Sequence, residues 1–213
     1  MTGKIYIIGI GPGSSEYLTK IAIDTVKKSD YTVGSTRAIA LFDDVKNKVP
    51  FNVKELLNKL EEAVELAIKG YVVSILSTGD PGFSGVLNTV LRISLDKNFP
   101  KKNIEVIPGI SSLQLAAAKN KIQWDDANVM TFHGRENIED ILKVINNGKT
   151  TIALPSRKVK DMAQFLLDNN VDESRKVVVC ERLNPYTIFK LDKKANPYHF
   201  SRWRRRGFWL SIN

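Results

Sequence analysis

The chain has 213 residues, of which 43% are hydrophobic and 26% charged, and it carries a formal net charge of +9. This length suffices for one large or two small domains with a sizeable core. No apolar run approaches the roughly 20 residues that span a bilayer, and the N-terminus lacks a signal-peptide pattern, so we expect a cytoplasmic protein without membrane contact. The single Cys180 excludes an intramolecular disulfide and a cysteine-based zinc site.

Strands alternate with helices along the N-terminal part. Apolar spacing over 53–70 predicts an amphipathic helix that ends at Gly70, and the β-branched run from residue 71 predicts a buried strand. In chain order we expect a strand over 4–10, a helix over 16–28 capped by Ser14 or Ser15, a strand over 30–35, the helix over 53–70, the strand from 71 that leads into a glycine-rich loop ending at 85, a helix over 86–95, and a strand, Pro-Gly turn and helix over 104–120.

The same alternation resumes after a connector at 121–127. It predicts an α/β fold built from two α/β domains with mainly parallel sheets, which we place at residues 1–120 and 121–213. The expected elements of the second domain are a strand over 128–134, a helix over 136–146, a strand over 150–156, a helix over 157–169 and a strand over 175–183.

Three glycine-containing loops follow predicted strands. They are GIGPGS (9–14), STGDPGFSG (77–85) and PGISS (108–112). Ligands of open α/β sheets bind beyond the carboxyl ends of the strands. Glycine permits close approach of backbone, and proline or serine fixes and caps the turn. We therefore expect these loops to build the binding site.

The first loop does not fit a dinucleotide-binding turn. Gly9 and Gly11 match that pattern, but Ser14 takes the third glycine position, and no acidic residue ends the next predicted strand. Pro12 also removes a backbone donor that would face a pyrophosphate. A phosphate loop is excluded because no Gly-Lys-Ser/Thr follows.

The carboxylates near the predicted loops and connector, and the lone cysteine, can each have a structural role. Asp80 either contacts a polar ligand or caps its own loop, as Asp-Pro-Gly commonly does. Asp125 and Asp126 lie in the connector, which favours helix capping or solvated charge over an acid–base pair. Cys180 is interpreted as core packing.

Taken together, the loops resemble the tetrapyrrole (corrin/porphyrin) methylase family over residues 5–183. The resemblance rests on the ordered motifs IIGIGPGSSEYLT, VGSTR, STGDPGFSG, VIPGISSLQLAAAK, WDDA, FHGR and VVVCERL. Within the family, PGISSLQLAAA and FHGR favour the enzymes that methylate C5 of cobalt-precorrin-7 or precorrin-7 over the C11, C20 and uroporphyrinogen methylases. The family fold has two α/β domains with the active site in the interdomain cleft, and its members are commonly homodimers.

The resemblance implies S-adenosylmethionine as methyl donor, with no protein-bound metal. Its implied contacts are Ile10, Gly79, Asp80, Phe83, Ser111, Ser112 and, from the second domain, Leu154.

The resemblance also implies a corrinoid substrate rich in carboxylates, which Arg, Lys and Ser side chains would meet. The candidate substrate-binding residues are Gly11, Pro12, Gly13, Ser14, Ser15, Arg37, His133 and Arg135. His133 is also the candidate for moving the proton at C5. Surface ion pairs for the two arginines, and a bond to a neighbouring carbonyl for His133, are the alternatives. Glu181 and Arg182 are possible further cleft residues.

The ending departs from the family. Segment 184–213 holds two of the three Trp and shows no clear helical or strand period. From Lys190 to the end it contains seven Lys and Arg and one Asp, so this part alone supplies +6 of the net charge. It is either a true variant or a non-native ending, such as a shifted reading frame would produce. If this atypical basic tail is native, we expect the second sheet to lack strands.

Other functions remain open from sequence alone. One is another tetrapyrrole C-methyltransferase or a diphthine synthase relative. A second is nucleic-acid binding through the basic tail, which we consider unlikely because the charge is not on a folded face. A third is a folded but inactive family member.

Overall fold

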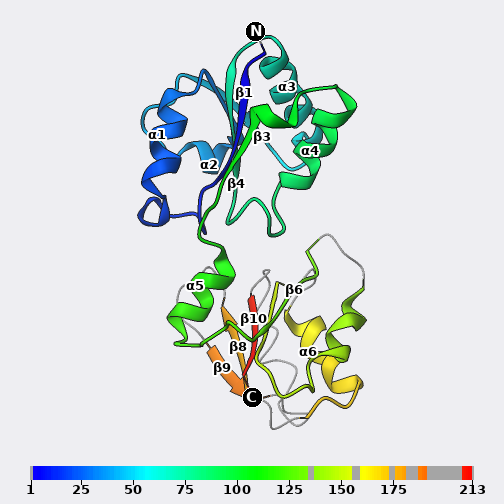
Figure 1. Cartoon of the computed structure of the whole chain (residues 1–213). Coiled ribbons are helices and arrows are strands. Elements are labelled where there is room, and N and C mark those ends of the chain that lie inside the picture. Colours follow the sequence, from blue (N-terminus) through cyan, green and yellow to red (C-terminus); the bar gives the residue numbers. More distant parts are fainter. Residues whose placement is uncertain are drawn as a thin grey trace. The chain divides into compact units, whose positions relative to one another are not determined.

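The computed structural model describes residues 2–133, 137–154, 159–172, 176–180, 187–190 and 208–212. The chain divides into two compact units, Met1–Ser112 and Leu113–Asn213 (Figure 1). Each unit is described by itself. The boundary between the units lies after Ser112, whereas we expected it after residue 120. The helix Ser112–Lys119 therefore belongs almost entirely to the second unit.

The first unit contains a fully parallel five-stranded sheet. Its strand order is β3-β2-β4-β1-β5, and every pairing is parallel. The strands are β1 (Lys4–Gly9), β2 (Tyr31–Ser35), β3 (Asn47–Phe51), β4 (Val72–Ser77) and β5 (Ile104–Ile107). The α/β class and the parallel pairing predicted for this part are confirmed.

Helices cover both faces of this sheet. They are α1 (Lys20–Lys28), α2 (Thr36–Ile39), α3 (Leu56–Ile68) and α4 (Leu87–Asp96), with short 3-10 helices η1 (Ser15–Tyr17) and η2 (Lys101–Asn103). Ile5 and Ile7 of β1 pack with the buried residues of α3 and α4, whereas Ile8 packs with those of α1 and α2. This alternation follows from the two-residue period of a strand, and Figure 1 shows the two helix pairs on opposite sides of the strands.

The N-terminal end of the first helix differs from the prediction. Helix α1 begins at Lys20, and its N-cap is Thr19, whose hydroxyl accepts a hydrogen bond from the Ala22 amide at 3.3 Å. Ser14 instead caps η1. The two helical pieces are separate because Leu18 and Thr19 have extended backbone.

The described residues of the second unit form a mixed five-stranded sheet. Its order is β6-β7-β10-β8-β9; β6 and β7 are parallel, and the other three pairings are antiparallel. The mainly parallel sheet predicted for this part is therefore wrong. The strands are β6 (Asn128–Thr131), β7 (Thr151–Leu154), β8 (Lys176–Cys180), β9 (Thr187–Lys190) and β10 (Phe208–Ile212); the helices are α5 (Ser112–Lys119), η3 (Ile138–Lys143) and α6 (Val159–Asp168).

A hydrophobic core lies between α6, the η3 segment and the sheet. It includes Ile141, Ile145, Met162 and Leu166, all of which are fully buried. The helix expected over 136–146 is a 3-10 helix over six residues, and residues 134–136 lie outside the described part of the chain.

The expectation that the tail leaves the second sheet short of strands is wrong. Strand β10 lies at the centre of that sheet, between β7 and β8. Trp209 pairs with Ala153 on one side and with Val179 on the other. No hydrophobic period marks this strand because it is only five residues long, and its pairing partners are distant in the chain.

We expect Leu210→Pro to destabilise the second unit. Leu210 pairs with Ile152 and Val178, and proline cannot donate its backbone hydrogen bond within this central strand. The unsatisfied acceptor alone costs about 1–3 kcal/mol of unfolding free energy, measured by urea denaturation. Val129→Pro is the matched control, since β6 is the edge strand of the sheet as far as the structure describes it and pairs there with β7 alone. Equal destabilisation by both variants would contradict a central β10.

Candidate active site

Three loops leave the same edge of the first sheet. Strands β4, β1 and β5 are adjacent and parallel, so their carboxyl ends lie side by side. Loops 9–14, 77–85 and 108–112 follow these three ends. The fold thus brings together the segments that the sequence singled out.

Backbone hydrogen bonds join the first two loops. The Gly79 amide donates to the Gly11 carbonyl at 2.8 Å, and the Gly11 amide donates to the Gly79 carbonyl at 3.3 Å. The Ile10 amide donates to the Ser77 carbonyl at 2.9 Å. Beyond the parallel pairing of β1 with β4, an isolated antiparallel bridge between Gly11 and Gly79 thus joins the two loops.

Glycines let the third loop approach the other two. A Cβ atom on Gly109 would lie 2.4 Å from the Gly79 carbonyl oxygen and 2.6 Å from the Gly9 carbonyl carbon. A Cβ atom on Gly9 would lie 2.4 Å from the Gly109 amide nitrogen. The contacts are to backbone, which cannot move aside cheaply, so these positions exclude side chains. We call Gly9, Gly79 and Gly109 the glycine junction.

The Asp80 carboxylate fastens the junction. Its Oδ1 accepts a hydrogen bond from the Gly82 amide at 2.8 Å, and its Oδ2 accepts one from the Gly109 amide at 3.2 Å. The first bond caps its own loop, as one of the two sequence interpretations held. The second bond ties this loop to the loop after β5, and no local pattern could have predicted it.

Gly79, in the junction, is buried and has a left-handed backbone conformation. This residue has φ +72°, and a Cβ atom there would meet only the Ser111 Cα atom, at 3.8 Å. The positive φ, rather than a lack of room, therefore favours glycine at this position. Within the same loop, the Phe83 amide donates a hydrogen bond to the Asp80 carbonyl at 3.2 Å, which closes a turn.

Arg37 lies against the loop after β1. A Cβ atom on Gly13 would lie 2.4 Å from Arg37 Nη2 and 3.2 Å from Arg37 Cζ. Among the described residues, none forms an ion pair with Arg37. The surface ion pair considered as an alternative for this side chain is thus not formed within that part of the chain.

The other expected residues of the first unit differ in what they offer a ligand. The Ile10 side chain is 1% exposed and packs with α1 and α2, so only its backbone is at the loop. Pro12, Ser14 and Ser112 are half-buried. The Ser14 hydroxyl accepts a hydrogen bond from the Glu16 amide at 3.4 Å.

In the second unit, His133 and Leu154 lie at the carboxyl ends of neighbouring strands. The Phe132 amide donates to the Leu154 carbonyl at 2.8 Å, and exposed His133 follows directly. The backbone amide of His133 donates to the Thr131 hydroxyl at 3.3 Å. Arg135 lies outside the described residues.

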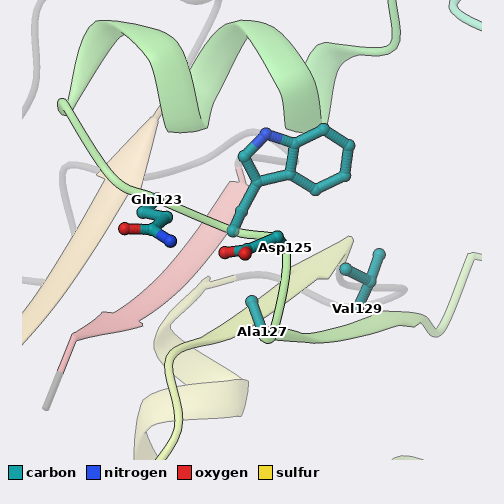
Figure 2. A pocket seen from close by; sticks show the side chains of 5 residues that line it. Gln123, Asp125, Ala127 and Val129 are labelled. Atoms are coloured by element: carbon teal, nitrogen blue, oxygen red, sulfur yellow. The ribbon is translucent and has the colours of Figure 1, made fainter.

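A recess of about 600 Å³ lies beside β6, lined by Gln123, Trp124, Asp125, Ala127 and Val129. Figure 2 shows Gln123 and Asp125 on the connector before the strand and Val129 on the strand. Both Asp125 and Asp126 are exposed in a turn, which agrees with the interpretation as solvated charges. The recess is at the amino end of β6, whereas His133 follows the carboxyl end.

Cys180 is a core residue, as expected. It is 1% exposed, and burial raises the pKa of its thiol above the ordinary value, against a smaller opposing effect of the hydrogen bond from Asn120 at 3.5 Å. Glu181 and Arg182 lie outside the described residues.

Within the described ranges, no group of three or more His, Cys, Asp or Glu side chains is arranged to hold a metal ion. Over the same ranges, no helix combines the length and apolar character needed to cross a bilayer.

Sequence reasoning missed Gly109 as the partner of Asp80, and it missed Ser77. The Pro-Gly pair directly after β5 was the available signal for Gly109. The Ser77 hydroxyl is buried and has no hydrogen-bond partner among the described residues. It lies 2.6 Å from the position of a Cβ atom on Gly85, at the base of the same loop as Asp80.

The model of the tetrapyrrole (corrin/porphyrin) methylases matches residues 4–184. The chain belongs to this family, whose methyl donor is S-adenosylmethionine.

A probable cobalt-precorrin-7 C(5)-methyltransferase from Methanocaldococcus jannaschii is 45% identical over 193 residues, which covers 90% of this chain and 89% of that protein. Among solved structures, the methyltransferase CobJ has a TM-score of 0.84 at 16% identity, covering 100% of this chain and 95% of that one. The Thermus thermophilus uroporphyrin-III C-methyltransferase complexed with S-adenosylhomocysteine has a TM-score of 0.74 at 21% identity, covering 98% and 97%. These two likenesses establish the fold alone.

We expect Asp80→Ala to destabilise the first unit. The change removes both acceptors and leaves the Gly82 and Gly109 amides without this partner. The unfolding free energy should fall by about 1–3 kcal/mol, measured by urea denaturation. Asp43→Ala, an exposed carboxylate in the same unit, is the matched control. An unchanged stability of Asp80→Ala relative to this control would contradict the fastening role.

Proposed function

We propose that this protein methylates C5 of cobalt-precorrin-7 in cobalamin biosynthesis, with S-adenosylmethionine as methyl donor. The observation that carries the proposal is the 45% identity, over nine tenths of the chain, to a relative with that activity in its name. We further propose that the protein acts in the cytoplasm, as a homodimer and without a bound metal of its own.

The glycine junction fits the cofactor. Its loops follow the carboxyl ends of adjacent parallel strands, where ligands of open α/β sheets bind, and the Asp80 bonds hold the loops in that arrangement. We assign cofactor contacts to Gly79, Asp80, Phe83 and Ser111, and to the backbone of Ile10. Ser112 and, in the second unit, Leu154 complete the assigned set. When bound, the sulfonium supplies an electrophilic methyl group that transfers by in-line displacement.

The protein's own part is to hold and orient its ligands. Because the reacting carbon of a corrinoid is electron-rich, the site needs alignment and exclusion of water rather than a protein nucleophile. Both Asp80 oxygens bond backbone amides, so the proposed part of this carboxylate in cofactor binding is to shape the loops that contact the cofactor.

The substrate side is assigned to the loop after β1 and its neighbours. Gly11, Pro12, Gly13 and Ser14 form the loop, and Arg37 supplies a positive charge beside it. Arg135 is assigned as a second carboxylate partner. His133, an exposed side chain after β6, is assigned to taking the proton at C5.

The alternative enzymes differ in product. Incubation with cobalt-precorrin-7 and a ¹³C-methyl donor, followed by NMR, locates the new methyl group on the macrocycle. Label at C5 supports the proposal. Label at another ring position indicates a different tetrapyrrole C-methyltransferase, and the metal-free substrate, tested in parallel, separates the two C5 activities.

We expect S-adenosylhomocysteine to bind once per chain with micromolar affinity in calorimetric titration. Asp80→Asn should weaken this binding at least about tenfold, because the amide group cannot accept both backbone bonds that shape the loops. Asp43→Asn is the control for charge. Absence of binding by the folded wild-type protein would refute the proposed function.

A nucleic-acid-binding function is tested through the basic residues. Deletion of everything after residue 189 is unsuitable, because it removes the central strand β10. The suitable variant replaces Arg202, Arg204, Arg205 and Arg206 with Gln. We expect S-adenosylhomocysteine affinity to stay within about twofold, since the assigned contacts lie on other segments. Salt-dependent binding of single-stranded RNA that the variant loses would instead favour the nucleic-acid function.

A further inference from the structure

We propose that Gly13 is a positioning residue for Arg37, and that the guanidinium it positions binds a carboxylate side arm of the substrate. The inference rests on the proposed function and deepens it. It assigns a specific task to the second glycine of the Gly-Pro-Gly turn.

The backbone of Arg37 is firmly placed. Arg37 is the second residue of α2, and the Ser35 hydroxyl caps this helix by accepting from the Ala38 amide at 3.2 Å. Ala38 and Ile39 are buried in the core formed with α1. The side chain therefore starts from a fixed point at the carboxyl end of β2.

The guanidinium occupies the space that a side chain at residue 13 would need. A Cβ atom on Gly13 would lie 2.4 Å from Nη2, 3.2 Å from Cζ and 3.6 Å from Nε of Arg37. All three nearest atoms belong to this one group. A methyl group at residue 13 would therefore push the guanidinium away from the loop.

Arg37 also has the chemistry of a carboxylate receptor. All six ion pairs among the described residues are formed by lysine, and Arg37 is in none of them. Its charge is permanent, and its planar donors match a carboxylate in two parallel hydrogen bonds. A corrinoid with several carboxylate arms is a ligand of the required class.

A double-mutant cycle tests the inference. Gly13→Ala, Arg37→Gln and the double variant are titrated with uroporphyrin, an octacarboxylate porphyrin, by fluorescence quenching. We expect Arg37→Gln and Gly13→Ala each to weaken binding about tenfold, as loss of one charge-assisted pair does. Gly13→Ala should change affinity less than about twofold when Arg37 is already Gln, because Gly13 then has nothing left to position.

Matched controls separate this role from general effects. Arg92→Gln makes the same change of charge at another exposed arginine and should leave uroporphyrin binding within about twofold. Gly148→Ala tests backbone strain alone. Like Gly13 (φ +107°), Gly148 has a positive φ (+82°), but no atom lies within 4 Å of a Cβ atom placed there. Arg37→Lys keeps the charge without the paired donors and should restore binding only in part.

The outcomes are distinct. If Gly13→Ala weakens uroporphyrin equally in both backgrounds, the loop rather than Arg37 is responsible, and the proposal fails. It also fails if wild type does not bind uroporphyrin, or if Arg37→Gln has no effect. If Gly13→Ala does not fold, the salt dependence of uroporphyrin affinity tests the carboxylate-binding role of Arg37 instead. We expect this affinity to depend less on salt in Arg37→Gln than in Arg92→Gln, and equal dependence in the two variants would contradict the role. S-adenosylhomocysteine titration of the same variants reports separately on the proposed function.

Discussion

The candidate site depends on the two hydrogen bonds that the Asp80 carboxylate accepts. These two bonds add directional links between loop segments whose glycine backbones lie in close contact. One carboxylate oxygen shapes its own turn, and the other crosses to Gly109. The hydrogen bonds between Gly11 and Gly79 then attach the loop after β1 to the same structure. Three strand ends thus behave as one surface.

A surface of this kind suits transfer of a methyl group from a sulfonium. The sulfonium ligand carries a positive charge. Lysine side chains at the junction would therefore weaken its binding by repulsion, whereas backbone carbonyl groups would favour its binding. In the first unit, the nearby cation is instead at Arg37, beside Gly13. The loops after β4 and β5 thus present backbone groups and the Asp80 carboxylate, and the positively charged guanidinium lies at the loop after β1.

Features that depend on nearby residues in the sequence were predicted correctly. The runs at β1 and β4, the helix α3 and the three loops followed from apolar period, Gly-Pro turns and order along the chain. The four-residue helix α2 and the exposed strand β3 were missed, because neither is long or apolar enough to show a period. The bond from Gly109 to Asp80 joins residues 29 positions apart, which no motif encodes. The class of site was thus predictable, and its fastening was not.

The C-terminal segment shows how composition alone misleads. Charge and tryptophan content suggested an appendage, yet β9 and β10 lie on either side of its most basic stretch, and both belong to the second sheet. A strand between β7 and β8 satisfies backbone groups on both of its sides, so the sheet depends on it whatever the side chains around it contribute. In the sequence, the basic stretch therefore stands between two strands of one sheet and is not a terminal appendage. Its effect on nucleic acid and its effect on stability are separable only by substitution, since deletion changes both together.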